Sequence, residues 1–176
     1  MNIFWIIFVL AAVYLFLVFF MTRRIVPFMS FKGFERPMQV PEEIKNTISE
    51  LENRSQEPIA YLQAVYDLVL DKTLHQWHHT RFKAGTQFPR AFVKDLNEIW
   101  QTRDFLYCTG INYLVYVMLT SSRFFKHSDI RVRYVFVNFF IHQYLQVRVG
   151  KNWTDVDPAG TGIRGKPLGA HLSFFG

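Results

Sequence analysis

The sequence predicts an α+β protein in which helices pack on a small antiparallel sheet, preceded by one N-terminal transmembrane helix. Three observations support this prediction. The chain of 176 residues begins with an apolar run, Ile3–Met21. Apolar residues then recur at intervals of three and four to about residue 120, which is typical of amphipathic helices. From Asp129 onward the period changes to two, in β-branched and aromatic residues, which is typical of strands.

The apolar run Ile3–Met21 has nineteen consecutive residues without a charge. As a helix rising about 1.5 Å per residue, it would span close to 30 Å, the thickness of one hydrocarbon core. A cleavable signal peptide is the alternative, but no Lys or Arg precedes the run and no A-x-A-like site follows it. We therefore expect an uncleaved anchor over residues 1–22, in contact with the lipid bilayer through residues 3–21.

Basic residues lie only on the C-terminal side of this run, at Arg23, Arg24, Lys32 and Arg36. The positive-inside rule therefore places the following domain in the cytoplasm. The single cysteine excludes an internal disulfide and suits a reducing compartment. The expected location is the cell membrane, as a single-pass protein with its C-terminal domain facing the cytoplasm.

Composition and charge limit the partners and cofactors. The net charge is +6, but the basic residues form no long block and no nucleic-acid module accompanies them, so we expect no nucleic-acid partner. His75 and His79 are spaced i, i+4, beside His78, and would present a metal-binding pair on a continuous helix. No cysteine or acid of ligand spacing lies nearby, whereas a structural site needs about four protein ligands. We therefore expect neither metal nor other cofactor.

The helical part of the chain divides into a linker and a domain. Prolines between Ile25 and Pro41 break up any long helix, and an amphipathic helix follows over 42–54, so residues 23–57 are interpreted as a juxtamembrane linker. The domain is expected over residues 58–176. Its predicted helices begin at Pro58, where a helix start tolerates proline, at Pro89 with an end near Trp100, and at Cys108.

Cys108 is the residue on which a functional interpretation depends. Free cysteine is commonly a small buried hydrophobe, and that is the simpler interpretation. At a helix start, however, unpaired N–H groups and the positive end of the helix dipole would stabilise a thiolate, which is the nucleophilic form of cysteine.

The strand region predicts a neighbour for His142. Gly150-Lys151 separates the patterns His142–Val149 and Asn152–Val156, which favours a type II′ hairpin with Val149 opposite Asn152. In this register Tyr144 lies opposite Asp157, and His142 projects from the same face as Tyr144. His142 and Asp157 then become diagonal neighbours within hydrogen-bonding reach, and Leu145 and Val147 face the core.

These residues carry a resemblance to a known family. CTGINYLVYVML at Cys108 and IHQYLQVRVGKNWTDVDP at Ile141–Pro158 resemble the nucleophile helix and the His and Asp strands of the transglutaminase-like superfamily of papain-fold cysteine enzymes. The resemblance covers roughly residues 59–158. It implies a papain-like fold with Cys108 as nucleophile, His142 as base and Asp157 as the residue that orients it. The chain departs from the family pattern at Tyr107, Thr109 and Gln143.

The implied activity is cleavage or transfer at an amide or peptide bond of a protein or peptide substrate, through an acyl-enzyme on Cys108. The backbone N–H of Cys108 is one candidate oxyanion donor, and the side chains of Gln101 and Trp100 are weaker ones. A different class remains open: a catalytically inactive, membrane-tethered binding module on the same fold. A thiol redox protein is less favoured because there is no resolving cysteine.

Overall fold

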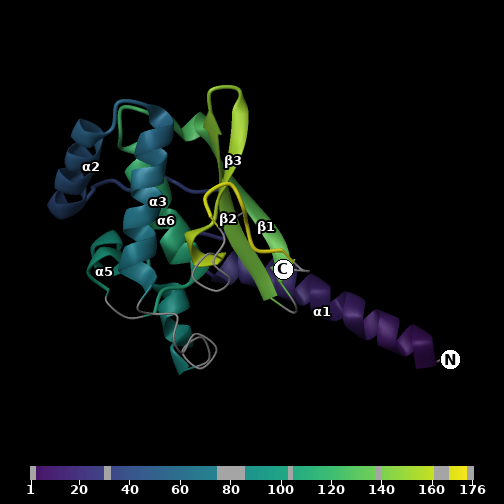
Figure 1. The fold of residues 1–176 in the computed structure, drawn as a ribbon. Coiled ribbons are helices and arrows are strands. Elements are labelled where there is room, and N and C mark those ends of the chain that lie inside the picture. The colour runs from purple at the N-terminus through teal and green to yellow at the C-terminus, as the bar shows by residue number, and fades with distance from the viewer. Residues whose placement is uncertain are drawn as a thin grey trace.

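The computed structural model describes residues 3–29, 33–74, 86–102, 105–137, 140–160 and 167–173. Helices come first along the chain and the strands follow (Figure 1). The elements are α1 (Ile3–Ile25), α2 (Glu42–Arg54), α3 (Pro58–Leu74), the 3-10 helix η2 (Phe88–Phe92), α5 (Leu96–Gln101), α6 (Cys108–Thr120), the 3-10 helix η3 (His127–Asp129), β1 (Ile130–Val137), β2 (Phe140–Val149) and β3 (Asn152–Val156).

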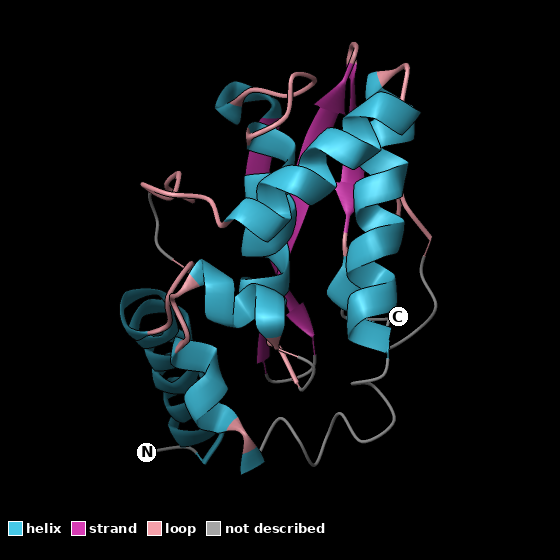
Figure 2. Ribbon diagram, turned by 90° about the vertical axis from the view of Figure 1, so that its left-hand side faces the viewer, coloured by secondary structure: helices cyan, strands magenta, loops and turns pink. Residues whose placement is uncertain are grey.

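The strands form one antiparallel sheet in the order β1-β2-β3. Helix α6 contacts β2, α3 and α5 contact α6, and α2 contacts α3. Figure 2 shows the helices in front of the strands, so they form a layer over one face of the sheet. The predicted α+β arrangement of helices on a small antiparallel sheet is thus confirmed. Its narrower assignment to the papain-like fold stays a prediction.

Helix α6 is the centre of the core. Every residue from Thr109 to Thr120 is buried, which is expected of a helix that is apolar on all sides. Burial of a large aliphatic side chain such as Leu114 or Met118 contributes roughly 1.5–3 kcal/mol. Tyr61 of α3 donates its hydroxyl to Met118 O at 3.0 Å, which ties the two helices together and satisfies a buried polar group.

The two helices before it follow the predicted pattern. Helix α2 buries Ile44 and Ile48, has glutamates in its first turn and ends on Arg54, which suits the helix dipole. Helix α3 begins at Pro58 as predicted. Of the apolar residues that recur at helical spacing in α3, Ile59 is 42% exposed because it lies in the first turn, outside the core. The other members are buried or partly buried in the core: Leu62, Val65, Tyr66, Val69 and Leu70.

The single helix predicted from Pro89 to Trp100 is wrong: the segment forms η2 and α5 with a break between them. The break is caused by a helix cap. Asp95 has an extended backbone and its carboxylate accepts the Glu98 N–H at 2.8 Å, so it starts a new helix instead of continuing the old one. Apolar periodicity predicted one continuous helix because Leu96, Ile99 and Trp100 of α5 are buried at helical spacing.

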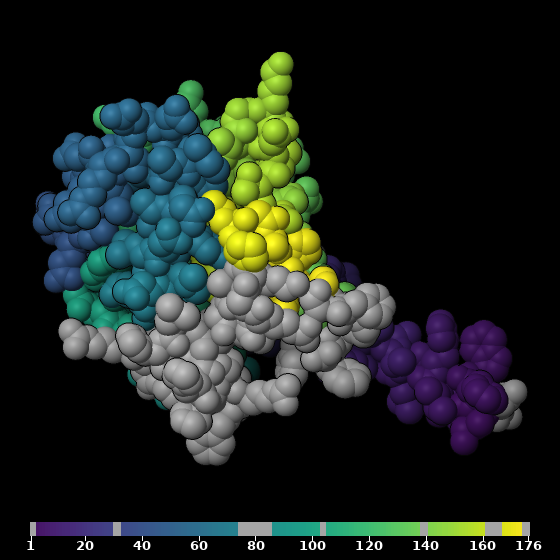
Figure 3. Space-filling view, viewed as in Figure 1, coloured from purple at the N-terminus to yellow at the C-terminus, as the bar shows by residue number. Residues whose placement is uncertain are grey.

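Helix α1 has 23 residues, and its most apolar stretch of 18 residues has a mean hydropathy of 2.9 and is not buried in the domain. Figure 3 shows it projecting from the rest of the molecule. The chain therefore has an N-terminal helix long and apolar enough to cross a membrane, as predicted from residues 3–21. A signal sequence near an N-terminus can also form a helix this long and apolar.

The predicted hairpin register is confirmed. Val149 pairs with Asn152, Val147 with Thr154, and Leu145 with Val156. Gly150 has a φ of 62°, and Lys151 is not among the described residues with positive φ, which agrees with the type II′ turn. Leu145 and Val147 are fully buried, so the face predicted to meet the core does so.

Candidate active site

Cys108 is the first residue of α6. Tyr107 precedes it with an extended backbone, and the Tyr107 carbonyl accepts the first helical bond, from Ile111 N at 3.1 Å. The predicted position at a helix start is therefore confirmed, although the residues on either side of Cys108 do not match the family pattern. The Cys108 side chain is half-buried, in contrast to the fully packed interior of α6.

His142 and Asp157 meet as the hairpin register predicts. His142 Nε2 lies 2.9 Å from Asp157 Oδ1 and 2.8 Å from Oδ2. His142 is 7% exposed and Asp157 is fully buried. A buried carboxylate needs hydrogen-bond donors to compensate for lost water, and the imidazole supplies one of them.

Two backbone N–H groups supply further donors to the same carboxylate. Gly160 N donates to Asp157 Oδ1 at 2.8 Å, and Leu172 N donates to Oδ2 at 2.9 Å. A Cβ atom at Gly160 would overlap the Asp157 carboxylate, so glycine is required for this close approach. Asp157 is thus held in one orientation from three sides.

The interactions of His142 bring Cys108 into the same site. Burial disfavours the charged imidazolium, but hydrogen bonds to Asp157 and to Cys108, together with their negative charges, outweigh it and raise the His142 pKa to about 10. Because Nε2 faces Asp157, Nδ1 is the ring nitrogen left for the thiol. The structure therefore brings together all three residues that the sequence singled out.

A second polar group lies directly beside the site. Gln143 donates through Nε2 to Phe28 O at 2.7 Å and to the Tyr134 hydroxyl at 3.3 Å, and Asn112 Nδ2 donates to Gln143 O at 2.6 Å. Burial raises the Tyr134 pKa, the hydrogen bond from Gln143 and the charge of Arg23 oppose this rise, and the charge of Cys108 adds to it. The sequence marked Gln143 only as a departure from the family pattern, because its partners come from three separate segments.

The two side-chain candidates for the oxyanion hole have another partner. Trp100 Nε1 donates to Glu43 Oε2 at 2.9 Å, and Gln101 Nε2 donates to the same oxygen at 2.6 Å. These bonds join α5 to α2. The donor groups are thus directed to Glu43, whereas the Cys108 N–H lies in the first turn of α6, where helix N–H groups have no intrahelical acceptor.

The C-terminal segment covers the other face of the sheet beside Asp157. His171 stacks on Tyr144 with ring centroids 4.2 Å apart, and its Nδ1 lies 2.8 Å from Asp155 Oδ2. Gly169 N also donates to Asp155 O at 2.9 Å. Figure 1 shows this segment, in yellow, crossing β2. No local pattern in the sequence pointed to this partner of His171, which lies sixteen residues away.

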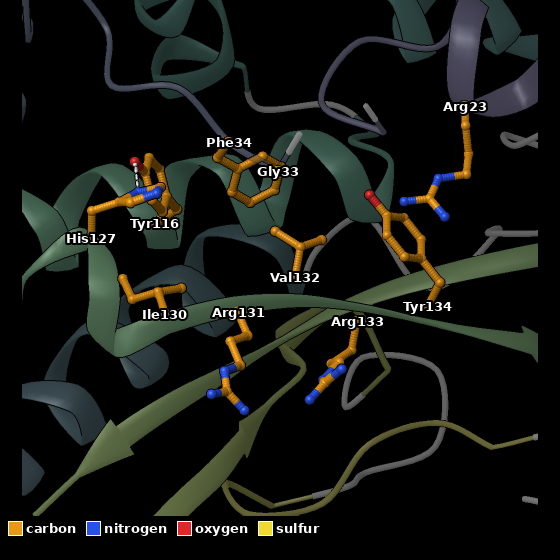
Figure 4. A pocket seen from close by; sticks show the side chains of 10 residues that line it. All are labelled: Arg23, Gly33, Phe34, Tyr116, His127, Ile130, Arg131, Val132, Arg133 and Tyr134. Atoms are coloured by element: carbon orange, nitrogen blue, oxygen red, sulfur yellow. Dashed lines mark hydrogen bonds between the residues drawn. The ribbon is translucent and has the colours of Figure 1, made fainter. Parts of the chain in front are cut away.

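A cleft of about 290 Å³ lies on the helix side of β1. Figure 4 shows Phe34, Val132 and Tyr134 facing it, with Arg23 of α1 at one end and the Tyr116–His127 hydrogen bond at the other. Arg131 and Arg133 point to the opposite side of the strand. Tyr134, which lines the cleft, also accepts the Gln143 hydrogen bond.

The predicted histidine cluster, His75, His78 and His79, lies outside the described residues. Comparisons with known proteins give no further assignment: no family model, no curated protein and no solved structure matches this chain. What the site can do is therefore argued from its own geometry.

Proposed function

We propose that the protein is a membrane-anchored, transglutaminase-like cysteine enzyme that acts on amide or peptide bonds through Cys108, His142 and Asp157. The observation that carries the proposal is the imidazole of His142, which bonds a fully buried carboxylate and whose pKa is raised by the neighbouring Cys108. A nucleophile, a base and a group that orients the base are the parts required for nucleophilic catalysis.

The geometry supports a two-step reaction. The Cys108 thiolate attacks the carbonyl carbon, and the His142 imidazolium gives its proton to the leaving nitrogen as the C–N bond breaks. An amine or ammonia departs and an acyl thioester remains. Water or a lysine amine then attacks the thioester while His142 takes its proton, which yields an acid or a new amide and restores the thiolate.

Charge on the carbonyl oxygen requires a donor in the transition state. The backbone N–H of Cys108 suits this role because it belongs to the first turn of α6 and adjoins the nucleophile. Asp157 would keep the imidazole in one orientation and stabilise its charged form, since it is itself fixed by Gly160 and Leu172.

The cleft beside β1 supports a protein or peptide substrate. Strand β1 is an edge strand of the described sheet, and an extended chain can pair with such an edge. The cleft, which runs along this strand and ends at Tyr134, offers room for side chains of such a chain close to the thiol.

Helix α1 supports a membrane location for this activity. Its length and mean hydropathy suit one membrane crossing, and its last turn carries Arg23 and Arg24. The positive-inside rule favours a single-pass protein of the cell membrane with the Cys108 site on the cytoplasmic side.

The proposal is tested with the full chain in membranes. A thiol-directed amide probe is expected to label Cys108 in wild type, at least ten times more slowly in Asp157→Asn, and not at all in Cys108→Ala. Labelling in urea is the control, because unfolding removes any activation by His142. Equal rates in wild type, Asp157→Asn and urea would contradict the proposal.

A second experiment looks for the products of the proposed reaction. Membrane proteomes of cells that carry wild type or Cys108→Ala should differ in cleaved or cross-linked peptides. If the two proteomes agree while both proteins retain the same binding partner, the chain is a binding module and the enzyme proposal fails.

A further inference from the structure

We propose that the end of the sheet formed by Phe136, Val137 and Ile141, here termed the sheet tip, lies in the interface of a lipid bilayer beside α1 and places the Cys108 site at the membrane surface. This inference rests on the part of the proposed function in which α1 spans a membrane. It is independent of whether the site is catalytic and of which side of the membrane the domain faces.

The first observation is direct contact between α1 and the tip. The rings of Phe19 and Phe136 have centroids 6.5 Å apart, and the Arg23 guanidinium lies 4.2 Å from the centroid of the Tyr134 ring. The half-buried residues of the last turns of α1 are spaced by three and four and so share one helix face. They are Val18, Phe19, Thr22 and Arg23.

The depth of the tip follows from this contact. Arg23 and Arg24 end the apolar run of α1 and mark the boundary of the hydrocarbon layer. Phe19 lies one turn earlier, or about 6 Å deeper at 1.5 Å per residue. Because Phe136 packs on Phe19, the tip lies level with the last apolar turn of α1, in the zone where aromatic side chains of membrane proteins concentrate.

The second observation is a change of surface chemistry along β1. Side chains two apart on a strand share a face. The face that carries Arg131 and Arg133 continues with Val135 and Val137, so cations give way to apolar groups at the level of Tyr134. That is also the level of Arg23.

The sequence at the tip continues this pattern. Phe136, Val137 and Ile141 carry no charge and are each partly exposed. The opposite end of the sheet turns at Gly150-Lys151, where Lys151 is exposed. The sheet thus has an apolar end, which suits contact with lipid, and a polar end, which suits contact with water.

The position of the sheet tip determines how far the Cys108 site lies from the bilayer. His142 follows Ile141 directly and pairs with Val135, so its backbone lies roughly 3.4 Å, one strand residue, beyond the tip. An amide held at the bilayer surface would therefore lie close to the Cys108 thiol.

Spin labels on the full chain in phosphatidylcholine–phosphatidylglycerol vesicles test the proposal. In a Cys108→Ser background no other cysteine is present. Val137→Cys and Ile141→Cys carry the label at the tip, one on each strand, and Lys151→Cys carries it at the other end of the same sheet as the matched control. Power saturation then compares collisions with oxygen, which is enriched in lipid, and with a water-soluble nickel chelate.

The ratio of oxygen to nickel collisions is expected to be several-fold higher at both tip positions than at Lys151→Cys. A tip label as open to the nickel chelate as the Lys151→Cys label would overturn the proposal. Two tip positions guard against a single variant that fails to fold, and near-UV circular dichroism identifies such a variant. Because the background lacks the thiol, the result does not depend on enzyme activity and separates this proposal from the catalytic one.

Discussion

Gly160 and Asp157 are in closer contact than any side chain at Gly160 would permit. The Gly160 N–H donates to Asp157 Oδ1 at 2.8 Å, and an added Cβ would overlap the carboxylate. Asp157, the residue proposed to align His142, can therefore keep its orientation only if position 160, three residues later, has no side chain beyond a hydrogen atom.

Gly160→Ala is therefore expected to displace Asp157 and to lower the free energy of unfolding by roughly 1–3 kcal/mol, the usual cost of overpacking. Probe labelling of Cys108 should slow at least tenfold because His142 loses its fixed partner. Gly110→Ala is the matched control: its Cβ would meet only Leu106 Cδ2 at 3.9 Å, and alanine favours a helix by about 0.5–1 kcal/mol. Denaturant unfolding and labelling rates check both variants, and equal behaviour of the two would contradict the argument.

Asp157→Asn should lower the pKa of His142, because the hydrogen bond and the charge of Asp157 both raise it. Cys108→Ala should lower it as well, for the same two reasons. The imidazole resonances in a pH titration by NMR measure each shift. A His142 pKa that does not change in either variant would show that the imidazole contacts neither residue in solution.

The same pKa predicts how stability depends on pH. His142 binds its proton more tightly in the folded chain, with a pKa of about 10 against 6.5 for an ordinary histidine. Its contribution to stability is therefore complete below about pH 6.5 and is lost as the pH rises toward 10. Wild type should lose more stability than Asp157→Asn between these values, as measured by urea unfolding at a series of pH values. A larger loss in Asp157→Asn would reverse the sign and refute the assignment.

His171→Phe should loosen the C-terminal segment without removing its stacking on Tyr144. The substitution deletes the bond to Asp155, which is worth roughly 1 kcal/mol or slightly more if charged. Hydrogen exchange at the Leu172 amide, which donates to Asp157, is expected to quicken about fivefold. The Gly160 amide serves as an internal control, because it bonds the other oxygen of the same carboxylate from a local turn. Unchanged exchange at Leu172 would show that His171 does not hold the segment.

Gln101→Ala separates the candidate oxyanion donors. If Gln101 stabilised the oxyanion, its loss would cost about 10²–10³ in rate. Since its amide is bound to Glu43, we expect acyl transfer to slow by less than threefold. A matched variant, Glu43→Gln, weakens the same contact from the α2 side and should also have a small effect. A hundredfold loss in Gln101→Ala alone would restore Gln101 as the donor.

The sequence alone determined the features that depend on local pattern. The apolar run fixed α1, periods of three and four fixed α2, α3 and α6, and Gly150 fixed the turn and thereby the register of β2 and β3. Because a hairpin register sets which side chains are neighbours, the contact of His142 with Asp157 follows from the two-residue turn alone.

Local pattern failed where a capping bond or a distant partner decided the outcome. Asp95 divided a segment whose periodicity looked continuous, and Glu43, from another helix, engaged the donors of Trp100 and Gln101. In both cases one specific polar contact outweighed the apolar periodicity on which the prediction was based.

Only the tertiary structure decided what surrounds the three proposed catalytic residues. Cys108 and His142 are thirty-four positions apart and no register links them, so packing of α6 on β2 brought the thiol to the imidazole. The same holds for Leu172 on Asp157 and for Phe19 on Phe136, which join segments far apart in the chain. Such contacts depend on how the surfaces of whole helices and strands pack together. The residues that determine this packing are distributed along the chain, so no single stretch of sequence predicts the contacts.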